Sequence, residues 1–370
     1  MGYLPCPYSR DHLIRLVQML TKSLVNIADE SGEFLVHTGD GRVIDPKGWN
    51  DWEWTHGVGL FGLYRYYEVT GCASTFAILQ DWFANRFKAG TPPKNINTMA
   101  PLLALAYLYE RTREISYLPY LEAWAEWLMA PDGLPRTEEG GFQHAVMERE
   151  NPQELWDDTL MMSVLPLAKI GRLLARPHYI EEAKRQFLLH IKYLADRDSG
   201  LWFHGWTFVG RHHFAGALWA RGNSWVTIAI PEIIDILDLP EGDAFRIFLV
   251  ETLIAQVKAL HRTQHESGLW HTLITDPTSY VEASATAGFA YGILKAVRKN
   301  YIPREYCAMA FRAVDGIIAN INESGELGKV SYGTPMGDTL QFYKEIPLTS
   351  MPYGQSLAIC ALSEVLRATA

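Results

Sequence analysis

Residues 153–174 read QELWDDTLMMSVLPLAKIGRLL, and this stretch decides the expected fold. After Trp156, Asp157 and Asp158, apolar residues recur at helical spacing as far as Leu174. Carboxylates directly before an apolar run are typical of a helix start, where backbone N–H groups are unpaired. In one interpretation Asp157 or Asp158 is only an N-cap, which contributes about 1 kcal/mol. In the other, one aspartate caps the helix and its neighbour points into a cleft as an acid or base, because adjacent helical residues do not share a face.

The same helical pattern recurs along nearly the whole chain, with few strand-like segments. We expect twelve amphipathic helices, at His12–Asp29, Val58–Val69, Ser74–Phe87, Met99–Glu110, Tyr117–Leu128, Thr159–Leu174, Ile180–Leu194, Ser224–Leu237, Ala244–His261, Ala285–Lys299, Arg304–Ile318 and Pro352–Ala368. The loop sequence DSGLWFH at 198–204 returns as ESGLWH at 266–271, each time after a helical segment. Repeated helix–loop units without a linker predict an all-α fold, a single (α/α)₆ barrel over residues 1–370.

The composition of the chain argues against several classes of function. The 370 residues carry a net charge of −9 and no Lys/Arg cluster, which argues against a nucleic-acid partner. No signal peptide or membrane-spanning run is visible, so we expect a cytoplasmic protein. The four cysteines are scattered, there is no HExxH motif, and the GxGxxG match at 57–62 does not follow a strand. We therefore expect no metal and no cofactor.

Tryptophans gather in the polar loops that would meet at one end of such a barrel. Eight of the twelve, namely Trp49, Trp52, Trp54, Trp156, Trp202, Trp206, Trp219 and Trp225, lie beside Asp, Arg, Asn, His or Gly. Aromatic faces with polar edges are typical of sugar-binding sites. The simpler alternative is that these side chains only plug the ring. For any single tryptophan that alternative is favoured, but the set as a whole favours a sugar site.

Asp158 is the leading candidate for proton transfer. A desolvating wall at Trp156 and the like charge of Asp157 would raise its pKa towards the range of a general acid, whereas a helix N-terminus would lower it. His144 and His204 lie in loops rich in Gly and aromatic residues. Arg221, in the sequence WARGNSW at 219–225, is either a structural ion-pair residue or the cation for an anionic ligand, with Gly222 allowing close backbone approach.

Together these blocks resemble the unsaturated uronyl hydrolases of glycoside hydrolase families 105 and 88, and family 105 more closely. The matching blocks are WEWTHGVGLFGL at 52–63, KNINTMAPLLALAYLYE at 94–110, LWDDTLM at 155–161, WARGNSW at 219–225 and VEASATAGFAYG at 281–292. The resemblance implies an (α/α)₆ barrel that removes a 4,5-unsaturated uronic acid from the end of a small, lyase-generated oligosaccharide. It assigns Asp158 as the acid that protonates the C4=C5 double bond before water adds. Substrate binding would fall to Trp52, Trp54, Asn95, Asn97, His144, Trp156, His204, Trp219, Arg221 and Trp225.

One departure from the family pattern leaves alternatives open. Relatives carry a second functional aspartate near the block occupied here by Lys94–Asn97, where Asn95 or Asn97 keeps hydrogen bonds but no charge. An inverting glycosidase would need a second carboxylate, for which Glu53, Glu282 and Asp338 are candidates. An epimerase would need two bases, such as His144 and His204, and a non-catalytic sugar-binding protein would need neither. The sequence does not distinguish glucuronate from galacturonate, nor does it indicate an oligomeric state.

Overall fold

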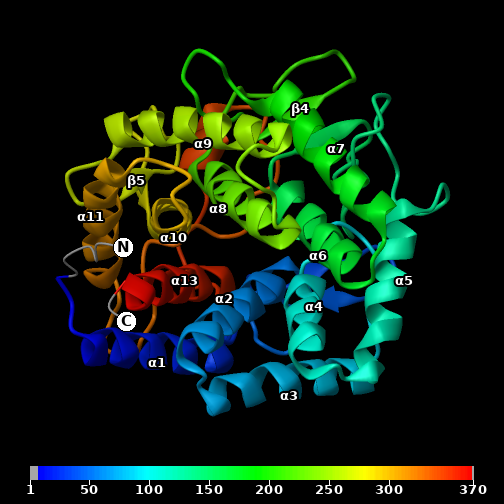
Figure 1. Cartoon of the computed structure of the whole chain (residues 1–370), viewed down its shortest axis with the longest axis horizontal. Helices are drawn as coiled ribbons and strands as arrows, with labels where there is room; N and C mark the ends of the chain where they lie inside the picture. The colour runs from blue at the N-terminus through cyan, green and yellow to red at the C-terminus, as the bar shows by residue number, and fades with distance from the viewer. Residues whose placement is uncertain (1–6, 369–370) are drawn as a thin grey trace.

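The computed structural model describes residues 7–368, and within them two concentric rings of helices form a toroid (Figure 1). The inner ring consists of α2 (Trp54–Thr70), α4 (Pro101–Thr112), α6 (Leu165–Leu173), α8 (Ala220–Leu237), α10 (Ala283–Arg298) and α13 (Pro352–Ala368). The outer ring consists of α1 (Arg10–Asn26), α3 (Ala73–Ala89), α5 (Leu118–Met129), α7 (Pro177–Leu194), α9 (Ala244–Thr263) and α11 (Cys307–Ile318). All twelve expected helices and the expected (α/α)₆ architecture are thereby confirmed.

The two rings differ in how their helices are buried. In α8 nearly every side chain is buried, whereas α1 buries only Leu13, Leu16, Val17, Leu20 and Leu24 along one face. A helix that is apolar on all sides belongs inside a protein, and a one-sided helix belongs at its surface. The ring is closed by α13, which packs against α2, α10 and α1.

The glycine-rich segment at the start of α2 serves packing. A Cβ added at Gly57 would lie 2.6 Å from the backbone of Ala100 and Pro101, so glycine is required where α2 meets the start of α4. The GxGxxG match is therefore explained by helix contacts.

Short strands and helices organise the connecting loops. Antiparallel pairs form between β1 (Val36–His37) and β2 (Val43–Ile44), between β3 (Glu154–Trp156) and β4 (Gly205–Thr207), and between β5 (Trp270–His271) and β6 (Val281–Glu282). The short elements are the 3₁₀ turns η1 (Ile115–Tyr117) and η3 (Arg304–Tyr306), the π-helical turn η2 (Leu160–Val164) and α12 (Leu340–Lys344). The strands, η1 and α12 were not predicted, whereas η2 and η3 lie inside the predicted helices Thr159–Leu174 and Arg304–Ile318. The β3–β4 pair and η2 shape the site described below.

The C-terminal halves of the inner helices carry a buried ionic network. Glu232 of α8 is fully buried and accepts hydrogen bonds from Arg65 of α2 at 2.8 Å and from Lys295 of α10 at 2.6 Å. Tyr291 also donates to Glu232, and Lys295 is 3.0 Å from Asp235. This network joins α2, α8 and α10 inside the ring.

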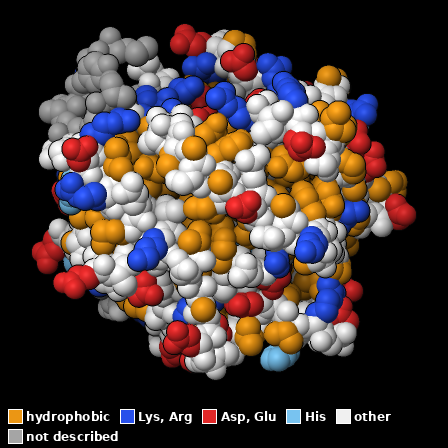
Figure 2. Space-filling view, turned by 90° about the horizontal axis from the view of Figure 1, so that it is seen from below, with side chains coloured by type: hydrophobic (Ala, Val, Ile, Leu, Met, Phe, Trp, Pro, Cys, Tyr) orange, Lys and Arg blue, Asp and Glu red, His pale blue; other side chains and the backbone are white. Residues whose placement is uncertain are grey.

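The surface carries charges of both signs. On the face seen in Figure 2, Lys/Arg and Asp/Glu side chains alternate with apolar patches, and no single sign dominates. Among the described residues, no helix has the length and apolarity needed to span a bilayer.

Candidate active site

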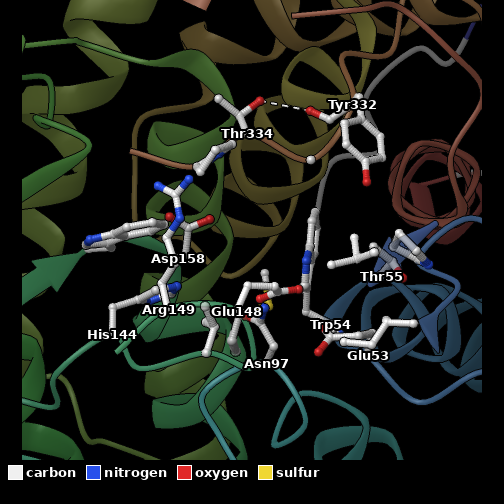
Figure 3. Close-up of a pocket in the computed structure, with 18 of the residues that line it drawn as sticks. Glu53, Trp54, Thr55, Asn97, His144, Glu148, Arg149, Asp158, Tyr332 and Thr334 are labelled. Carbon is white, nitrogen blue, oxygen red and sulfur yellow. Dashed lines mark hydrogen bonds between the residues drawn. The ribbon is translucent and has the colours of Figure 1, made fainter. Parts of the chain in front are cut away.

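A cavity of about 270 Å³ opens at the end of the toroid where the inner helices α2 and α8 begin. Seven residues predicted from the sequence line it: Trp54, Asn97, His144, Trp156, Asp158, Trp219 and Arg221. Figure 3 shows Asp158 and His144 on one side and Glu53 and Trp54 on the other, with Asn97 between them. Loops that are far apart in sequence therefore meet at one site.

Four other predicted residues do not line the cavity. Trp52 was expected at the mouth, but it is 3% exposed and packs in the core against Trp82 and Trp124. Asn95 is buried and its side-chain oxygen accepts from the backbone of Asn97 and Thr98, so it shapes a turn. These two placements correct the sequence prediction. The remaining two, His204 and Trp225, lie directly behind Asp158.

Asp158 is held by two neighbours and remains partly accessible. Trp225 Nε1 donates to Asp158 Oδ1 at 3.1 Å, and His204 Nε2 lies 3.3 Å from Oδ2. The side chain keeps 15% of its surface exposed. Burial alone would raise the pKa of Asp158, but its interaction with His204, helped by His144 and Arg221, outweighs burial and lowers the pKa. Desolvation is thus the largest single effect on this carboxyl, but the interactions that favour its anion outweigh it together.

Asp157 is a fully buried carboxyl without a hydrogen-bond partner for either oxygen among the described residues. Burial, reinforced by the charge of Asp158, raises its pKa well above the usual value for aspartate. Its side chain does not cap a helix, and only its backbone carbonyl accepts, from Leu160 N–H at 3.3 Å. The N-cap interpretation is thus wrong for this residue. The two carboxylates also approach each other, since side-chain atoms of Asp157, Asp158 and His204 all lie within 4.8 Å.

The local backbone explains this approach. β3 pairs with β4 so that Trp156 lies opposite Gly205, and Asp157 N–H donates to His204 carbonyl at 3.0 Å. The chain then enters the π-helical turn η2 before α6 begins. A π turn changes the angular spacing of side chains and is common at functional sites. The rule that adjacent helical residues face apart therefore does not hold at this strand-to-helix junction.

Both histidines of the site are buried and neutral. Burial lowers the pKa of His144 to about 3, and its ring stacks on Trp156 with a centroid distance of 4.2 Å. Burial also lowers the pKa of His204, whose Nδ1 is 2.7 Å from the hydroxyl of Tyr343. If Tyr343 donates to Nδ1, then His204 carries its proton on Nε2, directed towards Asp158.

Arg221 is occupied by protein groups. Its guanidinium donates to Ser331 carbonyl at 2.9 Å, to Tyr332 carbonyl at 3.0 Å and to Thr334 Oγ1 at 2.9 Å. The residue is 1% exposed and holds the loop 331–334 against the start of α8. Gly222 was expected to admit a ligand, but it faces the carboxyl of Asp157.

Asp157, Asp158 and His204 are the described residues that could together hold a metal ion. The chemistry of this set fits a metal poorly, because metal binding requires deprotonated ligands and burial favours the protonated form of Asp157.

With this geometry in place, comparison with known proteins identifies the family. The profile described as Glycosyl Hydrolase Family 88 matches residues 26–369. The chain is also 32% identical over 319 residues to the unsaturated rhamnogalacturonyl hydrolase YesR of Bacillus subtilis strain 168, covering 85% of this chain and 90% of that protein. The chain belongs to glycosyl hydrolase family 88. It is therefore a glycoside hydrolase.

Two crystal structures resemble this family 88 chain over its whole length. One, from Salmonella enterica serovar Paratyphi A, is described as a possible member of family 105; it is 58% identical, with a TM-score of 0.98 and coverage of 100% of this chain and 97% of that one. The other, from Klebsiella pneumoniae and described in the same way, is 56% identical with a TM-score of 0.96 and full coverage of both chains. The expected resemblance to families 105 and 88 is confirmed.

Sequence reasoning missed several residues of the family 88 cavity. Glu148, Arg149, Tyr332 and Thr334 line it, and none of them was singled out as a site residue. Of the three carboxylates considered for an inverting glycosidase, Glu53 lines the cavity, whereas Asp338 does not. Glu282 is fully buried and accepts from the backbone N–H groups of Ala285 and Ser331. The only sequence feature shared by Glu148, Arg149, Tyr332 and Thr334 is a position in a loop. That feature is too weak to identify residues that line a cavity.

Glu53 yields a prediction for stability against pH. Burial raises the pKa of this carboxyl to about 8, far above the usual value of 4.5. A raised folded-state pKa stabilises the fold below pH 4.5, and this contribution is lost as pH rises through about 8. We therefore expect Glu53→Gln to gain stability relative to wild type by roughly 3 kcal/mol between pH 5 and pH 8, at 1.36 kcal/mol per pKa unit.

Denaturant unfolding at both pH values measures this gain. Gln keeps an acceptor for the backbone N–H of Trp54, which donates to Glu53 at 3.0 Å. The exposed Glu323→Gln controls for the loss of one carboxyl. An identical effect of Glu53→Gln at pH 5 and pH 8 would contradict the prediction.

Proposed function

We propose that this family 88 hydrolase removes a 4,5-unsaturated uronic acid from the non-reducing end of oligosaccharides produced by polysaccharide lyases. The observation that carries the proposal is the position of Asp158, a partly exposed carboxyl in the wall of a cavity whose other walls are Trp54, Trp156 and Trp219. Aromatic walls suit a sugar ring, and the acid lines the same cavity, where it can reach a bound sugar. The relative YesR, described as an unsaturated rhamnogalacturonyl hydrolase, supports the same substrate class.

In this proposal Asp158 protonates C4 of the enol-ether double bond and water adds at C5. The hemiketal that results opens and releases the remainder of the oligosaccharide. Trp225 and His204 fix the carboxyl, while Trp54, Asn97, His144, Trp156 and Trp219 contact the sugar. No metal or cofactor enters the scheme, and we propose that the chain acts as a single catalytic domain in the cytoplasm.

Ultraviolet spectroscopy tests this function. Unsaturated disaccharides carrying glucuronate-derived or galacturonate-derived ends should lose the absorbance of the conjugated double bond when the enzyme is added. Saturated glycosides with the same leaving group form the comparison. Hydrolysis of the saturated compounds alone would replace the proposal with an ordinary inverting glycosidase, and conversion without release of the second sugar would replace it with an epimerase.

Arg149 is the cation we propose for the substrate carboxylate. It lines the cavity from an exposed loop, and none of the described residues forms an ion pair with it, whereas Arg221 is engaged by the loop 331–334. We expect Arg149→Gln to raise KM about 3- to 10-fold with little change in kcat, which is the size of one partly solvated ion pair. The effect should shrink at high salt, because exposed charges are screened.

Steady-state kinetics at low and high ionic strength measure this change. Arg211→Gln, whose side chain is exposed and pairs with Glu138, controls for the loss of one surface charge. A salt-independent fall in kcat would assign Arg149 a structural role.

A further inference from the structure

The pair Asp157–Asp158 has a feature that the proposed reaction does not explain. Asp158 would be the proton donor, yet its neighbours lower its pKa, so that at neutral pH it holds no proton to give. Asp157 is fully buried beside it, and both of its oxygens lack partners among the described residues. An isolated buried carboxylate costs several kcal/mol, so this group is held neutral.

The structure leaves room for the Asp157 carboxyl at a specific place. A Cβ added at Gly222 would lie 2.3 Å from Asp157 Oδ2, so any other residue at the start of α8 would displace the carboxyl. Among the described residues, His204 Nε2 approaches Asp158 Oδ2 at 3.3 Å, and a carboxylate oxygen of Asp158 also lies within 4.8 Å of one of Asp157. A carboxylic acid needs an acceptor for its proton, and a carboxylate oxygen of Asp158 lies within 4.8 Å of Asp157, a separation that one water can bridge.

We propose that Asp157 and Asp158 share a single proton, which rests on Asp157 and is delivered to the substrate through Asp158. Asp157 is then a positioning residue that acts through its neighbour. Two carboxyls at short range cannot both ionise easily, so the pair keeps one proton over a wide pH range and titrates as a unit. The inference rests on the proposed function for the destination of the proton.

Over one turnover, the pair of carboxyls gives one proton to the substrate and recovers one from water. Asp157 passes its proton to Asp158, and Asp158 gives it to C4 of the double bond, which leaves two adjacent carboxylates. Their mutual repulsion makes the pair a strong base. The water that bonds to C5 loses a proton to the pair, which restores the single-proton state. Net addition is one water molecule, and one pair of carboxyls provides both the acid and the base.

The groups around the pair favour this distribution of charge. The ionisable side chains that face it are His204, His144, Arg221 of α8 and Tyr343 of α12. His204 and His144 are neutral because burial lowers their pKa values, and burial raises the pKa of Tyr343 so that its hydroxyl stays protonated. Arg221 is the cation near Asp158, and it favours the anion there. The proton consequently rests on Asp157.

The variant Asp157→Asn tests the inference through its pH profile. Asn fills the same space and can donate an N–H to Asp158, but it cannot pass on a proton. Asp158 alone would then be protonated only in proportion to acidity, so the kcat deficit relative to wild type should shrink about tenfold per pH unit between pH 7 and pH 5. Asp338→Asn, an exposed residue outside the cavity, should show a constant ratio to wild type over the same range. A pH-independent deficit in Asp157→Asn would reduce Asp157 to a structural role and overturn the proposal.

A second measurement uses the wild-type enzyme and no substrate. Infrared spectroscopy with aspartate-specific ¹³C labelling should show a protonated aspartate C=O band at pH 7, and the labelling separates it from protonated Glu53. Absence of that band would overturn proton sharing even if Asp157→Asn failed to fold. Activity that EDTA abolishes and a divalent metal restores would also overturn it, in favour of a metal site. Lack of any activity on unsaturated substrates, with the band present, would instead refute only the proposed function.

Discussion

Asp158→Asn should lower kcat by more than the 10²- to 10⁴-fold typical of one general acid. The carboxyl is expected both to donate the proton at C4 and to receive one from the attacking water, so its loss removes two contributions. Asn keeps the size of the side chain and an oxygen that accepts from Trp225 Nε1, which now donates to Asp158 at 3.1 Å. The fold and substrate binding should survive, so KM should change little.

The loss of ultraviolet absorbance under saturating unsaturated disaccharide measures this effect. Asp338→Asn serves as the matched control, because it also converts an aspartate at this end of the toroid but lies outside the cavity. If Asp158→Asn retained more than about a tenth of wild-type kcat, Asp158 would not be the proton donor.

Glu232→Gln should produce the largest loss of stability, about 3–5 kcal/mol. Glu232 is the shared acceptor for Arg65 and Lys295, and its side chain has no exposed surface. Without the negative charge of Glu232, the buried cations Arg65 and Lys295 lose the counter-ion that they share between α2, α8 and α10. Burial alone would raise the pKa of Glu232, but the charges of Arg65 and Lys295 outweigh burial and lower it.

This depressed pKa fixes the pH dependence of the loss. A lowered folded-state pKa stabilises the protein above the unfolded value of 4.5 and ceases to do so as pH falls below it. The difference between wild type and Glu232→Gln in denaturant unfolding should therefore be largest near neutral pH and shrink in acid. Glu241→Gln is the control. The Glu241 side chain is 92% exposed and lies 3.9 Å from Arg246, so the two form a weak ion pair. Exposed pairs of this kind contribute at most about 1 kcal/mol to stability. Equal effects of the two variants would refute a stabilising role for the buried network.

The helical framework could be predicted from the sequence because it depends on local periodicity. Each of the twelve long helices repeats apolar residues at helical spacing, and the inner helices are simply those that are apolar on more sides. Asp158, His144 and Arg221 could be singled out because they stand in unusual polar and aromatic contexts, and Asp158 and Arg221 also lie next to helix starts. That signal was sufficient to place seven predicted residues around one cavity.

The remaining features depend on contacts between distant segments. Trp52 was misplaced because an aromatic beside polar residues looks the same in sequence whether it lines a cavity or packs on Trp82 and Trp124. The two terminal nitrogens of the Arg221 guanidinium are bound by the loop 331–334, about a hundred residues later, which no local pattern reveals. The approach of Asp157 to Asp158 arises from the β3–β4 pairing and the π turn η2, neither of which has a recognisable sequence signature.

Closure of the inner ring by α13 has a consequence for biosynthesis. Because α13 fills the space between α2 and α10, the apolar sides of those two helices stay open to water until the segment from Pro352 onwards has been translated. During most of its synthesis the nascent polypeptide therefore has an incomplete ring with exposed apolar helix surfaces. Such a state is prone to aggregation. Cells should need chaperones to shield that incomplete ring, and shortening the protein within its final helix should abolish soluble expression rather than weaken it gradually.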